Sequence, residues 1–78
     1  IEMKLALAHS LREHRDAQHL TQEQLAKMIG SSQSRVAKME AADSSVSMEL
    51  LVRSLLMLGA TREEVGRVIA RDSTVPAA

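Results

Sequence analysis

The sequence contains no phenylalanine, tyrosine or tryptophan, and it contains no cysteine. Without cysteine there are no disulfides, thiolate ligands or thiolate nucleophiles, which suits a reducing cytoplasm. Without aromatic side chains the core must be built from aliphatic residues and methionine. The platforms on which many proteins stack single-stranded nucleic acids are missing as well. Among nucleic acids, a duplex is therefore favoured over a single strand as a partner.

The sequence also lacks an excess of charge of one sign, and it lacks a long apolar run. The formal net charge is zero, which argues against a general adhesive for nucleic acids but allows a local basic patch. The longest apolar stretch, Leu50 to Leu58, is interrupted by Arg53 and Ser54 and is far shorter than the ~20 residues of a membrane span. No signal-peptide pattern is seen. We therefore expect one cytoplasmic domain with no membrane segment.

Motifs for catalysis and metal binding are absent too. Serine and histidine occur, but no surrounding motif would assemble a nucleophile, a base and an orienting group. His9, His14 and His19 recur at a spacing that spreads them around a helix instead of placing them on one face. There is no glycine-rich phosphate loop. We predict that the chain is not an enzyme and has neither a cofactor nor a metal site.

What the sequence does contain is helical spacing of apolar residues, with no strand-like alternation. The first helix is predicted over about Met3 to Gln18, with His19 as a left-handed break. Capping side chains then open four more helices: Thr21 with Gln24, Ser31 or Ser32, Ser47, and Thr61 with Glu64. Their predicted ends are Gly30, about Ala41, Gly59 and about Ala70. Residues 1–72 would form the domain, and residues 73–78, with Pro76, a disordered tail.

The apolar positions divide into an expected core and a surplus. The core is predicted to contain Leu7, Leu11, Leu25, Ala26, Ile29, Val36, Met39, Leu51, Leu55 and Leu58. More apolar residues remain on the last two helices than one small core can hide: Leu50, Val52 or Leu56, Met57, Val65, Val68 and Ile69. We interpret this surplus as a surface for a second copy of the chain, and we predict a homodimer.

The run from Leu20 to Glu40 carries most of the functional information. Ala26 is small enough for a close crossing of two helices, and Gly30 accepts the positive φ that a tight turn needs. The helix that follows, Gln33 to about Ala41, carries polar side chains on its outward face. Glutamine can pair with adenine N6 and N7, serine with several base edges, and lysine with guanine or a phosphate.

At these residues the chain resembles the Cro and phage-repressor type of helix-turn-helix protein, the XRE family. The matching pieces are Leu20-Thr21-Gln22, Leu25-Ala26, Gly30, Ser32-Gln33-Ser34, Val36, Glu40, Ser47, Leu51 and Leu58-Gly59. The resemblance implies an all-α fold, a compact five-helix bundle of the lambda-repressor-like DNA-binding type. It also implies that the chain binds a double-stranded DNA operator, usually as a dimer.

The resemblance assigns roles to particular residues. The expected DNA-binding residues are Gln22, Ser32, Gln33, Ser34, Arg35 and Lys38. Gln22 would contact phosphate and brace Gln33, while Arg15 and Glu40 would form a structural ion pair. For Arg35 and Lys38, either could contact a phosphate while the other contacts a base, and a merely solvated charged face is the alternative for both.

Two departures from the family pattern and one alternative function remain. Ala41-Ala42 stands where family members commonly have Asn-Gly, so we expect the third helix to run longer. Val46 stands where they often have proline. General likeness to antitoxins of the HigA kind suggests an alternative to a transcriptional repressor: an antitoxin whose main partner is a toxin protein, with operator binding as autoregulation.

Overall fold

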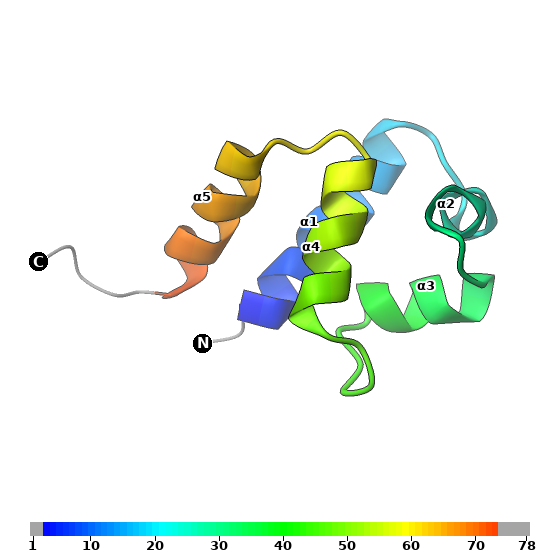
Figure 1. Ribbon diagram of the computed structural model, residues 1–78, viewed down its shortest axis with the longest axis horizontal. Helices are drawn as coiled ribbons and strands as arrows, with labels where there is room; N and C mark the ends of the chain where they lie inside the picture. The colour runs from blue at the N-terminus through cyan, green and yellow to red at the C-terminus, as the bar shows by residue number, and fades with distance from the viewer. Residues whose placement is uncertain (1–2, 74–78) are drawn as a thin grey trace, which may run out of the picture.

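Five helices make up the computed structural model of the chain, which describes the backbone of residues 3–73 and the side chains of residues 3–70 (Figure 1). They are α1 (Met3–Ala17), α2 (Gln22–Ile29), α3 (Gln33–Glu40), α4 (Met48–Met57) and α5 (Arg62–Ser73). There is no strand within residues 3–73. The predicted all-α fold is confirmed. α5 is longer than expected, so Ser73 belongs to a helix, and the rest of the predicted tail, residues 74–78, lies outside the described residues.

Helices α1 and α4 lie side by side at the centre of the molecule, with α2 and α3 at one end and α5 at the other (Figure 1). The predicted core residues Leu7, Leu11, Leu51 and Leu55 are completely buried, because their spacing brings them to the facing sides of the two central helices. Of the predicted core only Ile29 is half-buried. The core therefore joins α2 and α3 to the two central helices.

Capping side chains start the helices as the sequence predicts. Thr21 Oγ1 accepts a hydrogen bond from the amide of Gln24 at 3.0 Å, and the Thr21 amide donates to Gln24 Oε1 at 2.8 Å. Thr61 and Glu64 form the same reciprocal pair at the start of α5. Ser47 caps α4, and of the two candidates for α3 it is Ser32 that caps.

Helices α1 to α4 all end with the same closure. A residue in the left-handed conformation follows each helix, and the next amide donates to a carbonyl five residues back. The four bonds are Leu20 N to Arg15 O, Ser31 N to Ala26 O, Asp43 N to Lys38 O, and Ala60 N to Leu55 O. The left-handed residues are His19, Gly30, Ala42 and Gly59.

Ala42 corrects one expectation from the sequence. α3 does not run longer where Ala41-Ala42 replaces the family's Asn-Gly: it ends at Glu40, and Ala42 takes φ 54°. The helix stops because the closing bond to Lys38 O is kept and because Val46, 2% exposed, anchors the following loop in the core. An alanine in this conformation costs about 1–2 kcal/mol relative to the right-handed helix.

The apolar surplus of α4 and α5 is smaller than expected. Val65 is buried, and four of the other residues pack half-buried against the core: Leu50, Val52, Val68 and Ile69. Leu56 and Met57 remain exposed, at 38% and 49%. None of the helices within residues 3–73 is long and apolar enough to cross a membrane.

Candidate nucleic-acid interface

The candidate interface is built on the crossing of α2 and α3. In Figure 1 α2 is seen end-on while α3 lies lengthwise, so the two helices cross steeply. Ala26 is 3% exposed, which gives the small buried side chain that a close crossing needs, and Gly30 makes the turn with φ 69°. Leu25, Val36 and Met39 are buried completely. The apolar side of α3 is thus covered, and its opposite side is left to solvent.

The structure brings the predicted site residues together on that free side. Ser32, Gln33, Ser34, Arg35 and Lys38 are all exposed, and Gln22 is half-buried at the start of α2. Ser32 is partly engaged, because its Oγ accepts the amide of Arg35 at 3.2 Å and lies 3.4 Å from Ser34 Oγ. Ser34 shares that contact, Gln33 keeps its amide oxygen available for a ligand, and Lys38 makes no ion pair within the described residues.

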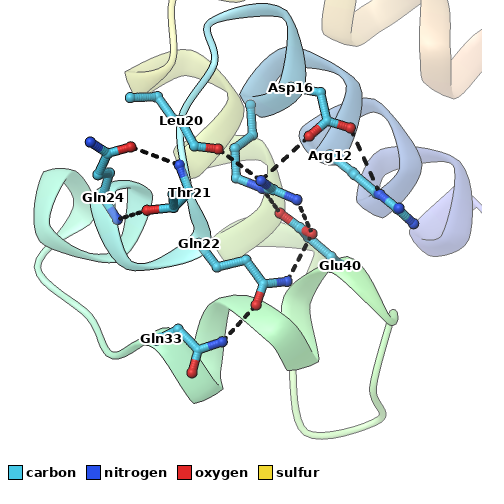
Figure 2. Close-up of polar contacts among 9 residues, drawn as sticks. Arg12, Asp16, Leu20, Thr21, Gln22, Gln24, Gln33 and Glu40 are labelled. Atoms are coloured by element: carbon cyan, nitrogen blue, oxygen red, sulfur yellow. Dashed lines mark hydrogen bonds and ion pairs between the residues drawn. The ribbon is translucent and has the colours of Figure 1, made fainter.

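Gln22 and Gln33 are joined directly, as the resemblance implied. Gln33 Nε2 donates to Gln22 Oε1 at 2.7 Å, and Gln22 Nε2 donates to Glu40 Oε1 at 3.1 Å (Figure 2). The sequence does not predict the second of these bonds. Spacing alone does not show it, because it joins the start of α2 to the end of α3 and exists only once the two helices have crossed. A continuous chain of hydrogen bonds therefore runs from Gln33 into the molecule.

This series of hydrogen bonds ends at the predicted ion pair between Arg15 and Glu40. Arg15 Nε donates to Glu40 Oε2 at 2.6 Å, Arg15 Nη2 donates to Oε1 at 3.1 Å, and Arg15 Nη1 donates to the carbonyl of Leu20 at 2.8 Å. The side chains are only 13% and 6% exposed. The hydrogen bonds to Glu40 raise the pKa of Arg15 above its ordinary value despite the opposing effect of burial. The guanidinium therefore stays charged and ties α1 to α3.

Two hollows flank the N-terminal half of α3. One, of about 260 Å³, lies toward the loop before α4 and is lined by Ser32, Ser34, Arg35, Lys38, Ser45 and Val46. The other, of about 460 Å³, lies toward the start of α2 and is lined by Arg15, Leu20, Thr21, Gln22, Glu23 and Gln33. Each hollow has hydrogen-bond donors on its wall. The polar side chains of α3 thus contribute to the walls of both hollows.

Charge on this face is basic at α3 and acidic at two neighbouring positions, Glu23 in the wall of the second hollow and Asp43 in the loop after α3. Within the described residues neither Arg35 nor Lys38 forms an ion pair. Asp43, for which the sequence predicts no role, accepts hydrogen bonds from Ser45 N at 2.9 Å and Ser45 Oγ at 2.6 Å. These bonds, with a smaller contribution from nearby Lys38, lower the pKa of Asp43. The loop thus keeps an ionised carboxylate beside the basic residues.

Two helices that cross steeply through a left-handed turn, with an exposed polar face on the second, define a helix-turn-helix domain of the DNA-binding class. The sequence agrees: residues 11–67 match the helix-turn-helix family HTH_3, and the chain belongs to this family. Membership supports DNA binding in transcription regulation, of the Cro and repressor type. No curated protein and no solved structure matches the chain.

Proposed function

We propose that this chain is a sequence-specific regulator of transcription, a repressor, that reads the major groove of duplex DNA with α3. The observation that carries the proposal is the bond between Gln22 and Gln33. It fixes a glutamine amide at the exposed N-terminal turn of α3, where helix-turn-helix domains contact base edges. A solvated surface glutamine has no need of such a partner, and holding it in place costs side-chain entropy.

The site residues divide between base edges and the DNA backbone. Gln33 and Ser34 face the base pairs, and Lys38 follows Ser34 by one helical turn, on the same face. Gln22 contacts a phosphate through its backbone amide, because it lies in the first turn of α2, where free amides and the helix dipole favour negative charge. Arg35 contacts phosphates of the other DNA strand, the one that Gln22 does not contact. Ser32 positions the turn between α2 and α3.

The proposal includes a dimer on a two-fold operator. A single short recognition helix reads only a few base pairs, so two copies with half-sites about one helical turn apart would supply the needed discrimination. Leu56 and Met57 are the apolar side chains of α4 that the monomer leaves exposed, and we assign them to the contact between copies. The antitoxin alternative stays a prediction, which a toxin-sized neighbouring gene would test.

Selection from a random pool of duplexes tests the proposal. The chain is expected to enrich one two-fold symmetric motif. Lys38→Ala should relax the preference at one base pair. Arg35→Ala should weaken binding to all duplexes alike and lower the slope of log K against log salt concentration by about one unit. Enrichment of no motif would contradict sequence-specific binding. Equal effects of the two variants on every duplex would contradict the division of roles.

A further inference from the structure

Glu40 pairs with Arg15 and also accepts a hydrogen bond from Gln22. In this second contact only Gln22 can be the donor. A carboxylate only accepts hydrogen bonds, whereas a glutamine amide can donate from nitrogen or accept at oxygen. Glu40 Oε1 lies 3.1 Å from Gln22 Nε2, so the Gln22 amide must turn its nitrogen toward Glu40 and its oxygen outward. Glu40 is only 6% exposed, and both of its oxygens also accept from Arg15, Oε2 from Nε and Oε1 from Nη2. The carboxylate therefore holds this orientation of Gln22.

The orientation passes on to Gln33. Because Gln22 presents an oxygen, Gln33 must present its nitrogen, and the two atoms lie 2.7 Å apart. One of the two Nε2 hydrogens of Gln33 is used in this bond. Its oxygen points away from Gln22 in Figure 2 and accepts no hydrogen bond from the described residues. Gln33 thus offers a ligand one acceptor and one remaining donor.

We propose that Glu40 is a positioning residue that sets the base preference of Gln33 by fixing the amide orientation of Gln22. This inference rests on the proposed function, because it concerns the same reading helix. Adenine presents one donor, N6, and one acceptor, N7, in the major groove, and Gln33 held by Gln22 satisfies both. Guanine presents two acceptors, O6 and N7, and Gln33 has only one hydrogen left for them. Cytosine and thymine each offer Gln33 a single hydrogen bond.

Glu40→Gln tests this direction with a change of almost no volume. The new amide can donate to Gln22 as well as accept from it, so both glutamines become free to turn over. Gln33 can then give both hydrogens to guanine. The measurement is the ratio of dissociation constants for duplexes that differ only at the base pair whose preference Gln33→Ala abolishes.

We expect the wild-type chain to prefer adenine over guanine there by about tenfold or more, as a good bidentate pair does. Glu40→Gln should reduce this ratio to within about threefold, because the amide orientation is no longer imposed. Uniform gains or losses in affinity, such as those from the altered charge, cancel in the ratio.

The chain offers a matched control and a second variant. Glu49 pairs with Arg53 at 3.0 Å on the exposed side of α4, so Glu49→Gln makes the same chemical change to a carboxylate paired with arginine. It should keep the wild-type ratio. If Glu40→Gln does not fold, Gln22→Met breaks the relay of hydrogen bonds that runs from Glu40 through Gln22 to Gln33. It does so without touching the buried ion pair, and it should lower the ratio equally.

Three results would overturn the proposal. One is a wild-type preference for guanine at this position, and the second is an unchanged adenine ratio in folded Glu40→Gln or Gln22→Met. In both cases specific DNA binding, and with it the proposed function, would still stand. If the wild-type chain instead bound all duplexes equally, the proposed function would fall and so would any role of Glu40 in base preference. An adenine ratio that falls in Glu40→Gln but holds in Glu49→Gln would support the relay.

Discussion

Breaking the ion pair between Arg15 and Glu40 from one side is expected to cost much of the stability of this domain. In Arg15→Met the carboxylate of Glu40, 6% exposed, would keep only its bond from Gln22. Removing one partner of a buried pair costs about 3–5 kcal/mol, because a charge is left without compensation in the interior. At 78 residues the domain has about 4–12 kcal/mol in total, so this single change could unfold a large fraction of it.

Urea unfolding followed by circular dichroism measures the effect, and two further variants isolate its cause. Arg53→Met breaks the exposed pair with Glu49, whose side chains are 65% and 79% exposed, and should cost no more than about 0.5 kcal/mol. The double change Arg15→Met with Glu40→Met removes both buried charges and should be more stable than Arg15→Met alone. The reasoning is refuted if Arg15→Met costs no more than Arg53→Met, or if adding Glu40→Met destabilises it further.

Three other predictions concern the loop, the acid limit and the dimer. Ala42→Gly relieves the strain of the left-handed alanine at φ 54°, whereas Ala41→Gly makes the same change at φ −89°. The Ala42→Gly variant should therefore be more stable to urea than Ala41→Gly by about 1 kcal/mol. The opposite order of stabilities would contradict the strain at Ala42. The lowered pKa of Asp43 means that its contribution to folding is present above the ordinary value of 3.8 and is lost as the pH falls through the folded value. Ser45→Ala should therefore raise this pKa toward 3.8 in an NMR titration, and an unmoved pKa would rule out the Ser45 bonds as its cause. Met57→Lys should yield a monomer in sedimentation experiments at concentrations where the wild-type chain is a dimer, and a wild-type mass that stays monomeric at all concentrations would exclude the dimer.

Local signals made most of the fold predictable. Thr21 with Gln24 and Thr61 with Glu64 are capping boxes whose two bonds join residues three apart, so they form wherever a helix starts there. The end of α3 was harder to predict from the sequence, because Ala41-Ala42 carries no stop signal of its own. Tertiary packing of the following loop through Val46 imposes that stop.

The candidate site was predictable in its residues but not in its internal order. The exposed polar face of α3 follows from helical spacing once Val36 and Met39 are placed in the core. The bond from Gln22 to Glu40 joins residues eighteen apart and depends on the angle at which α2 and α3 cross. For the same reason the sequence could not show whether Val65 meets the domain's own core or a second copy. An apolar stripe looks the same in both cases, and the packing of α5 against α1 decides.

The central claim, that α3 reads base pairs through Gln33, is tested most directly by comparing wild-type and Gln33→Ala chains. Both are measured on the duplex that the wild-type chain selects and on duplexes substituted at each single base pair. We predict that Gln33→Ala loses about 1–3 kcal/mol on the selected duplex and loses discrimination at one base pair per half-site. Unchanged affinity for the selected duplex, with discrimination retained at every position, would contradict the claim.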